Sequence, residues 1–464
     1  MVVLLKIVQV ILALSLLVLF HEFGHYSFAK LFKTRVEKFY LFFNPKRSLL
    51  KFKHFDGKWH CKAFASNDDP QWDAHPERTE YGIGWLPFGG YCAIGGMVDE
   101  THKTEDLSAE VQPWEFRSKP AWQRMLIILG GILVNFIGAL VIYWMLLWQY
   151  GSDKLPLRNM PDGLYYSQLL LDEGFQPQDK ILTINGEEPE ELQDVIWKIL
   201  IEKKRDVRVL RGADTVDITI SEEFLDKYFT AQNQHYNKKS FILITGWKPC
   251  VVDTVFPDMP AALAGMRKGD SIVAIGSDTT QCMADLTLAL QKHPCDSVDI
   301  AYYREGELLT ARVFIGDECA LGILAAPFDI EHTEYSFFQA MPAGAAFGWD
   351  VLVRYIQQFG IIFTNKQAAQ SIGGFGTIGS MFPPAWSWYA FWSMTAFLSV
   401  ILAFMNFLPI PVLDGGYVLF LLWEMITRRK PSDRFLEIAN QIGFWLLIAL
   451  LIFANGNDIK RFFF

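Results

Sequence analysis

Residues 17–30 read LVLFHEFGHYSFAK and end an apolar run that begins at Val2. Only Lys6 and Gln9 interrupt that run before Phe20. An ionisable side chain at the centre of a bilayer costs roughly 2.5–3.5 kcal/mol on insertion scales, so such residues are rarely kept without a use. Two histidines and a glutamate at the end of this run therefore indicate a functional site in a membrane helix.

The composition is that of a membrane protein. Hydrophobic residues make up 51% and aromatic residues 15% of the 464 positions. The net charge of −9, without a basic stripe, argues against nucleic acid as a partner. Four apolar stretches are long enough to cross a lipid bilayer, at 2–22, 125–148, 388–408 and 435–454. The first is interpreted as a retained helix, because it has neither the basic start nor the small-residue cleavage site of a signal peptide.

Lysine and arginine near the ends of the spans predict their orientation. Basic clusters lie at 30–38 after the first span, at 117–124 before the second, and at 428–434 between the third and fourth. All three clusters then fall on the cytoplasmic side. Both termini and the long stretch 150–385 are expected outside.

The pentapeptide HEFGH has the spacing of a zinc site. His21 and His25 are four residues apart, so on a helix both imidazoles reach one metal ion. Glu22 lies one step around the same turn and is predicted to act on the attacking water as the catalytic base. The alternative is that both histidines only form hydrogen bonds at the membrane interface.

The third zinc ligand is predicted at the end of the third span, in NFLPIPVLDGGY. Pro409 and Pro411 block a regular helix there, and Gly415 with Gly416 permits a sharp turn. Irregular backbone at membrane depth is tolerated where it is buried in protein or lines a polar cavity. We assign Asp414, at this break, as the ligand. Alternatively, Asp414 caps a helix that begins at Gly415.

Two asparagines complete the candidate site. The amide of Asn406 is suited to holding an extended substrate backbone or to stabilising an oxyanion, and equally to tying the unwound segment in place. Asn135, in GGILVNFIGAL of the second span, is a second candidate for substrate or oxyanion contact. Its surroundings also fit an anchor between helices, because Gly130 and Gly131 allow close helix approach.

Residues 36–100 alternate aromatic and β-branched residues between turn-forming groups such as FDG and NDDP. This pattern predicts two membrane-associated β-hairpins with a tip at Gly89–Gly90. They form either a soluble platform or a sheet edge that pairs with an extended peptide.

The outer region contains an internal repeat. GFQPQDKILTING starts at Gly174 and GMRKGDSIVAIGS at Gly265, and in each an aspartate follows the glycine by five residues, at Asp179 and Asp270. The turn followed by a strand resembles the circularly permuted PDZ domains of bacteria, with Gln178 where glycine is usual. Cys250, Cys282, Cys295 and Cys319 lie in this region, either as one or two disulfides or as free buried thiols.

Together the motifs resemble the site-2 protease family of intramembrane zinc metalloproteases, and within it the bacterial type with tandem PDZ domains. HEFGH and the Asn406-x-x-Pro-x-Pro-x-Leu-Asp414-Gly-Gly segment carry the resemblance, with WLPFGGYCAIGG and GGILVNFIGA in support. It implies a Zn²⁺ enzyme of the bacterial inner membrane, with its active site toward the cytoplasm and its PDZ domains in the periplasm. The implied substrates are single-span proteins such as an anti-sigma factor, and remnant signal peptides, screened by the PDZ domains.

The predicted fold is thus a polytopic α-helical membrane protein with a β-hairpin region and two β-rich PDZ domains. Its predicted parts are the first span (1–35), the hairpins (36–100), a connector and second span (101–150), two PDZ domains (151–240 and 241–330), amphipathic helices (331–385), the third span with the Asp414 motif (386–430) and the fourth span (431–464). The competing functions are a zinc transporter, which does not need Glu22, and a membrane scaffold, which does not need the ligand set.

Overall fold

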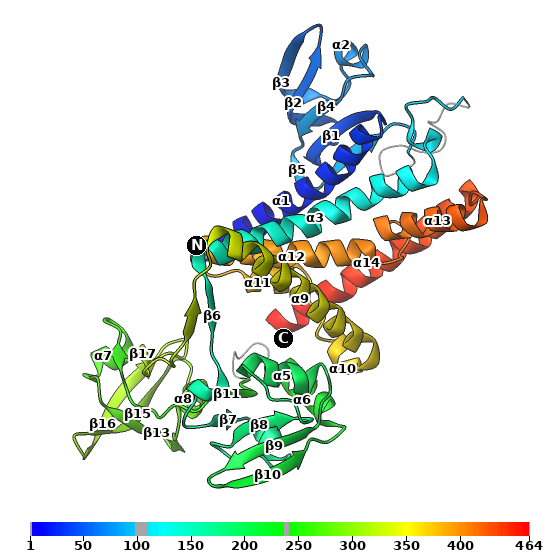
Figure 1. The fold of residues 1–464 in the computed structure, drawn as a ribbon. Coiled ribbons are helices and arrows are strands. Elements are labelled where there is room, and N and C mark those ends of the chain that lie inside the picture. Colours follow the sequence, from blue (N-terminus) through cyan, green and yellow to red (C-terminus); the bar gives the residue numbers. More distant parts are fainter. Residues whose placement is uncertain (1, 98–109, 236–240, 464) are drawn as a thin grey trace. The chain divides into compact units, whose positions relative to one another are not determined.

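The computed structural model describes residues 2–97, 110–235 and 241–463 (Figure 1). The parts of the predicted hairpin region, connector and PDZ domains that fall at 98–109 and 236–240 lie outside the described residues. The chain divides into two compact units. One unit contains the residues up to Gly151 together with Glu334–Ile356 and Gly373–Asp458. The other contains Ser152–Thr333, Gln357–Ile372 and the residues from Ile459 on.

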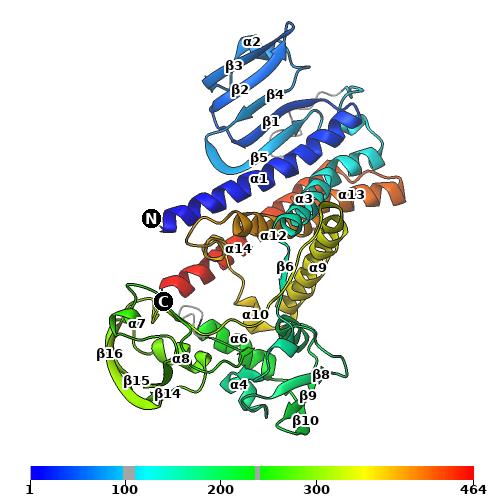
Figure 2. The same ribbon diagram turned by 60° about the vertical axis from the view of Figure 1, so that its left-hand side comes forward.

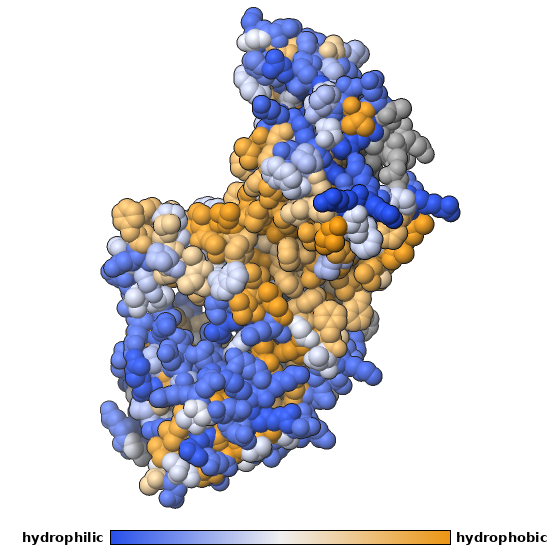
Figure 3. All heavy atoms as spheres, turned by 45° about the vertical axis from the view of Figure 1, so that its right-hand side comes forward, coloured by the Kyte–Doolittle hydropathy of each residue, from blue (hydrophilic) through white to orange (hydrophobic). Residues whose placement is uncertain are grey.

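Four helices in the described residues are long and apolar enough to cross a membrane. They are α1 (Val2–Leu31), α3 (Ala121–Tyr150), α12 (Trp388–Phe407) and α14 (Asp433–Phe463). The shortest, α12, has 20 residues, which at a rise of about 1.5 Å per residue is about 30 Å, the thickness of a bilayer core. The predicted four spans are confirmed by length and composition, and Figure 3 shows hydrophobic side chains gathered over the helical unit.

Helices α1 and α3 lie side by side at an unusually close glycine contact (Figures 1 and 2). A Cβ atom built on Gly130 would lie 2.7 Å from the carbonyl oxygen of Gly24, so any larger residue would clash with backbone. Small residues are the usual means of bringing membrane helices together. This contact sets the histidine-bearing part of α1 directly against α3.

The hairpin region forms one five-stranded sheet in the order β3-β2-β4-β1-β5. Its strands are β1 (Val36–Phe43), β2 (Arg47–Phe55), β3 (Lys58–Ser66), β4 (Glu80–Ile83) and β5 (Leu86–Ile94), with α2 (Pro70–Asp73) between β3 and β4. β2 and β3 form a predicted hairpin, but β4 pairs in parallel with β1, so the prediction of two hairpins is wrong. β5 is an edge strand that packs along α1 (Figure 2).

The predicted tip at Gly89–Gly90 is also wrong, because both glycines lie within β5. Gly89 has a φ of +103°, and the register between β1 and β5 shifts near this point. Such a bulge needs a residue that tolerates positive φ, which is glycine. At Gly90 an added Cβ would lie 2.8 Å from a methyl group of Val18, so its lack of a side chain lets β5 reach α1.

Outside the spans and the sheet, the first unit contains η2 (Phe116–Ser118), α11 (Phe375–Met381), α13 (Asp414–Thr427) and the first part of α9 (Phe337–Thr364). The end of α9 and α10 (Lys366–Ala369) belong to the second unit. α9 falls in the segment predicted to hold amphipathic helices. It packs on two spans, with Phe347 against Tyr143 of α3 and Tyr355 against Phe404 of α12.

The second unit contains the predicted repeat as two domains with separate hydrophobic cores. The first repeat domain contains β7 (Leu164–Tyr166), α4 (Gln168–Leu171), β8 (Lys180–Ile184), α5 (Leu192–Leu200), β9 (Asp206–Arg211), β10 (Asp214–Thr219), α6 (Phe224–His235) and β11 (Ile244–Gly246). The second contains β12 (Thr254–Val255), α7 (Pro260–Leu263), β13 (Ser271–Ile275), β14 (Asp278–Thr279), α8 (Met283–Leu290), β15 (Asp296–Arg304), β16 (Glu307–Ile315) and β17 (Ile323–Leu324).

The two repeat domains share the same order of elements apart from α6 in the first and β14 in the second. β11 pairs with β7 as β17 pairs with β12, so in both the last strand returns to the first. Leu243 and Ile244 belong to the first core, which moves the predicted boundary at 240 to about residue 246. Flanking strands β6 (Ser152–Lys154) and β18 (Glu331–Thr333) pair where the chain enters and leaves this tandem, and η3 (Leu157–Asn159) follows β6.

All six cysteines lie in the described residues and are free thiols, so the structure contains none of the one or two disulfides that were one alternative for the outer cysteines. Burial raises the pKa of the Cys250 thiol to about 12 and that of Cys282 to about 11. These two behave as small core residues, which is the second of the two interpretations of the cysteines.

Candidate metal centre

The two histidines of HEFGH both direct their Nε2 atoms toward the same point. Their Nε2 atoms are 3.1 Å apart, and the Nδ1 atom of His25 lies 2.9 Å from the Ile127 carbonyl oxygen of α3. A proton on Nδ1 satisfies that carbonyl and leaves Nε2 as an electron-pair donor. Both rings are thus arranged for Nε2 to face a shared cation.

Asp414 comes to the same point from a break between helices. α12 ends at Phe407 and α13 begins at Asp414 itself, so the aspartate is in the first turn of α13 and its side chain does not cap it. The capping alternative is therefore wrong. Val412 in the intervening segment has a φ of +84°, a strained conformation for a β-branched residue. Strain of this kind persists only where surrounding structure enforces it, and it clusters at functional sites.

The three donor atoms have the spacing of a tetrahedral site. Asp414 Oδ2 lies 3.2 Å from His21 Nε2 and 3.5 Å from His25 Nε2, which completes a triangle with the 3.1 Å between the imidazoles. Ligands held at about 2.0–2.2 Å from zinc in a tetrahedron lie about 3.3–3.6 Å apart. Among the described residues, these are a group of three side chains able to hold a metal ion.

Asp414 is left unsatisfied by the protein alone. Its Oδ2 atom is buried and has no hydrogen-bond partner in the described part of the chain. A buried carboxylate oxygen without a partner is costly, and a bound cation removes that cost. Gly131 of α3 leaves room beside the rings, since a Cβ there would lie 2.6 Å from His25 Nε2. Two imidazoles and one carboxylate are a donor set typical of catalytic zinc, so the residues fit this ion.

Asn135 contacts the Nδ1 side of the His21 ring, away from the Nε2 atom that faces the metal site. Its amide is fully buried, with Nδ2 3.4 Å from His21 Nδ1 and with Oδ1 lacking a partner in the described residues. If His21 binds metal through Nε2, its Nδ1 carries a proton and needs an acceptor. Turning the amide over supplies Oδ1 as the acceptor of that proton. The geometry favours a contact that orients His21 over the predicted contact with substrate.

The donor atoms line a cavity of about 760 Å³ within the helical unit. Glu22 and Asn406, both predicted site residues, also line it. Residues Gly89–Cys92 of β5 form another part of the wall. The structure therefore brings every predicted catalytic, metal and substrate residue to one place, except that Asn135 stands one layer behind.

The segment around Asp414 differs from its prediction in one respect. Gly415 and Gly416 lie in the first turn of α13, and the positive φ falls on Val412 instead. Their role is close packing, because a Cβ on Gly416 would lie 2.7 Å from the Pro411 Cα atom. Pro409 and Pro411 lie in the non-helical stretch as predicted.

The sequence reasoning missed a hydrogen-bonded pair in the cavity wall, Tyr417 on α13 and Asn440 on α14. The carboxamide of Asn440 donates a hydrogen bond of 3.1 Å to the Tyr417 hydroxyl. A signal for Asn440 existed, since it is a polar residue inside the fourth apolar stretch, and such residues are usually functional.

The repeat aspartates form a second kind of charged site. Arg211 donates to both carboxylate oxygens of Asp179, at 2.9 and 2.7 Å, and Arg304 does the same for Asp270, at 2.8 Å each. Each arginine also bonds the carbonyl of the glycine that starts the repeat motif. The arginines were missed, although they follow the aspartates by the similar spacings of 32 and 34 residues.

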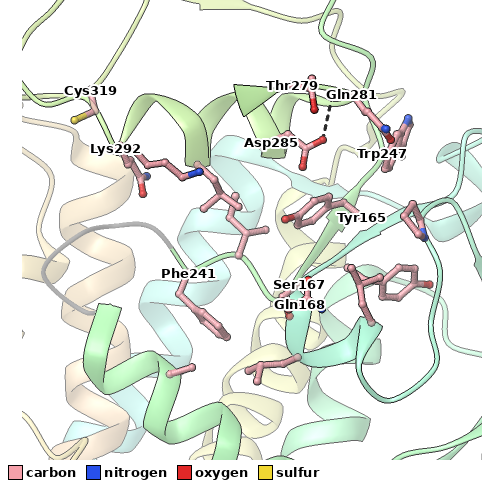
Figure 4. Close-up of a pocket in the computed structure, with 18 of the residues that line it drawn as sticks. Tyr165, Ser167, Gln168, Phe241, Trp247, Thr279, Gln281, Asp285, Lys292 and Cys319 are labelled. Atoms are coloured by element: carbon pink, nitrogen blue, oxygen red, sulfur yellow. Dashed lines mark hydrogen bonds between the residues drawn. The ribbon is translucent and has the colours of Figure 1, made fainter. Parts of the chain in front are cut away.

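A larger cavity, of about 1290 Å³, lies between the two repeat domains (Figure 4). Figure 4 shows Asp285 and Lys292 on the second domain, and Ser167 and Phe241 on the first. Burial, with the charge of Asp285 nearby, raises the pKa of the Tyr165 hydroxyl on this wall to about 12. Its lining mixes aromatic, amide and charged side chains, which suits a peptide more than a small apolar ligand.

Comparisons with known proteins agree with this site. The chain is 26% identical over 483 residues to the regulator of sigma E protease of Haemophilus influenzae, covering 97% of this chain and 98% of that protein. It is 25% identical over 477 residues to the regulator of sigma-E protease RseP of Escherichia coli, covering 97% of both. A protein of Borreliella burgdorferi, by its name a zinc metalloprotease, is 27% identical over 478 residues, again covering 97% of both.

The model of peptidase family M50 matches residues 9–65 and 70–450, a range that includes all three donor residues. The chain therefore belongs to peptidase family M50, the site-2 protease family, and is a zinc metalloprotease of that family.

Proposed function

We propose that this protein is an intramembrane endopeptidase that hydrolyses peptide bonds within the transmembrane segments of single-span proteins. The observation that carries the proposal is the meeting of His21, His25 and Asp414 with Glu22 in one cavity among membrane helices. The names of the relatives suggest an anti-sigma factor as one substrate. The family resemblance adds remnant signal peptides.

The roles follow from chemistry and position. His21, His25 and Asp414 hold Zn²⁺, which when bound supplies Lewis acidity for attack on the scissile carbonyl. Glu22 takes a proton from the attacking water and passes it to the leaving amine. Asn406 contacts the substrate carbonyl or its oxyanion from another part of the cavity wall.

The edge strand β5 receives the substrate. A transmembrane helix satisfies its own backbone groups, so it must unwind before cleavage and needs replacement hydrogen bonds in an apolar medium. Among the described strands β5 pairs with β1 alone, and its residues Gly89–Cys92 line the cavity. Addition of the unwound segment to this edge supplies those bonds.

The two repeat domains, as PDZ domains, screen substrates. The cavity between them and the paired strands at the ends of their fold support this role. The basic clusters support an orientation in the bacterial inner membrane with the metal site toward the cytoplasm and the repeats in the periplasm. A substrate with a large outer domain would then be excluded until another protease has shortened it.

The test uses the Glu22→Gln variant, which keeps the shape of the side chain and loses its basicity. Purified full-length protein is incubated with a single-span substrate, and bound zinc is measured in parallel. We expect cleavage to fall about 10²–10⁴-fold while zinc is retained and phenanthroline blocks the wild type. Glu437→Gln, an exposed position on α14 that does not line the cavity, is the matched control. Undiminished cleavage by Glu22→Gln would contradict the proposal.

A further inference from the structure

One polar side chain of the active-site cavity has no part in the mechanism above. Asn440 reaches the cavity from α14. Its Nδ2 atom is committed to the Tyr417 hydroxyl, whereas Oδ1 has less than 1 Å² of exposed surface and no partner in the described residues. A phenol both donates and accepts hydrogen bonds, so turning the amide over would keep that bond and leave Nδ2 unpaired instead.

One turn from Asn440, α14 makes a close backbone contact. Gly443, one turn further along α14, abuts the segment between α12 and α13, and a Cβ there would lie 2.8 Å from the Pro411 carbonyl carbon. The same segment leads into Asp414. This contact at Gly443, together with the bond from Asn440 to Tyr417, sets this part of α14 beside the segment that carries a metal ligand.

An unpaired buried amide group in a membrane helix is costly and requires a partner. The free protein does not supply one among the described residues, but an unwound substrate does, because its backbone has two edges. β5 pairs with one edge only, which leaves N–H and C=O groups along the other. Asn440 lines a part of the cavity formed by a different element from β5.

We infer that Asn440 binds the backbone of the extended substrate on the edge that β5 leaves unpaired. In the orientation that the structure has, Oδ1 accepts a substrate N–H while Tyr417 fixes the amide through Nδ2. This inference rests on the proposed function, and it assigns α14 to substrate binding. Tyr417 acts as a positioning residue for Asn440.

The experiment removes single backbone groups from the substrate. A set of peptides covering one single-span segment is made, each with one amide replaced by an ester, which deletes an N–H. Binding of each peptide to full-length, zinc-loaded Glu22→Gln protein is measured by fluorescence anisotropy. Esters that delete an N–H facing β5 should weaken binding in every variant. We expect one further position to weaken binding by about 3–10-fold, the value of one hydrogen bond, in the presence of Asn440.

In the Glu22→Gln, Asn440→Leu protein that penalty is expected to fall below about twofold, because the partner of the N–H is gone. Tyr417→Phe should reduce the same penalty in part. Gln441→Leu, an exposed neighbour outside the cavity, is the matched control and should keep it whole. Zinc content, and binding of the unmodified all-amide peptide to each variant, verify that the variants are folded.

An ester profile that is the same with Asn440 and with leucine would overturn the inference and leave the proposed function standing. If wild-type protein binds the peptides but cleaves none of them, the proposed function fails while the Asn440 contact is still decided by the profiles. Peptides that bind no variant at all would contradict both.

Discussion

Three aspartates of this protein are held in two opposite ways. Asp179 and Asp270 in the repeat domains are 1% exposed, and each is bound by an arginine through two hydrogen bonds. Each also accepts a backbone N–H, from Gln176 or Arg267. In the helical unit, Asp414 Oδ2 faces the two imidazoles at 3.2 and 3.5 Å and has no other polar partner among the described residues.

This difference separates structural from functional charge. A buried carboxylate whose bonds are all made by its own chain stabilises a fold and is available to nothing else. A carboxylate left short of a partner destabilises the fold unless something else binds it. The lack of an arginine or backbone N–H partner therefore distinguishes Asp414 as the functional aspartate.

The largest effect is expected at Asp414. Asp414→Asn keeps the side-chain shape and removes the charge, so zinc affinity should fall by more than about 100-fold, since even partners that only orient ligands are worth about 10–100-fold. A zinc titration against a competing chelator measures this, and cleavage should be lost with the metal. Full zinc occupancy in the variant would show that the carboxylate is not a ligand.

Asn135 should have a smaller effect on the same quantity. Asn135→Leu removes the acceptor that we assign to His21 Nδ1, and zinc affinity should fall about 10–100-fold. Asn135→Asp keeps an acceptor and should restore most of it, which a residue that only packs between helices would not do. The assignment fails if leucine and aspartate change zinc affinity equally.

Asp270→Ala tests the other side of the comparison. It leaves the Arg304 guanidinium and a backbone N–H without their acceptor. Hydrogen–deuterium exchange protection in β13 and β15 should fall at least about tenfold in the full-length protein, because bonds to a charged group are among the stronger ones. Zinc content should not change. Arg312→Met, which removes an exposed ion pair with Asp299, is the control and should have little effect.

Protonation of Asp270 at low pH should lower exchange protection of the second repeat domain, as Asp270→Ala does, but by a smaller amount. The Arg304 guanidinium, which donates to it, holds the pKa of the Asp270 carboxyl below its usual range. Its contribution to stability is therefore full above the unfolded pKa of about 3.9 and is lost as the pH falls through the lower folded pKa. Exchange protection of the second repeat domain, corrected for intrinsic rates, should decline below about pH 4. In Asp270→Asn exchange protection should fall less steeply as the pH is lowered. An equally steep fall in the variant would show that protonation of Asp270 does not cause it.

The sequence was informative where the signal is local. Apolar length predicted four spans, and the spacing of His21 and His25, together with the proline break before Asp414, predicted the metal ligands. It failed where the determinant is a distant contact. The parallel insertion of β4 beside β1 and the pairing of Tyr417 with Asn440 depend on segments that no local pattern connects. Val412 has a positive φ. A β-branched residue rarely adopts this conformation, so there was no signal for it in the sequence.

The smallest predicted effect lies in the turn that precedes each repeat aspartate. Gln178 in the first domain has a φ of +70°, and Gly269 holds the matching position in the second, with a φ of +95°. A left-handed conformation costs a non-glycine residue about 1–2 kcal/mol. Glycine pays about 0.5–1 kcal/mol in chain entropy instead. Gln178→Gly should therefore stabilise the first domain by about 1 kcal/mol or less, and Gly269→Ala should destabilise the second by a similar amount.

Exchange protection in β8 and β13 measures both changes in the same full-length protein. If the two substitutions change stability in opposite directions, both turns require a positive φ at this position. Gln178 then adopts that conformation with some strain. If Gln178→Gly instead loosens the first domain, the glutamine side chain makes a stabilising contact that outweighs the strain. In that case the two repeats differ in more than the residue at one turn, although their Asp–Arg pairs are built alike.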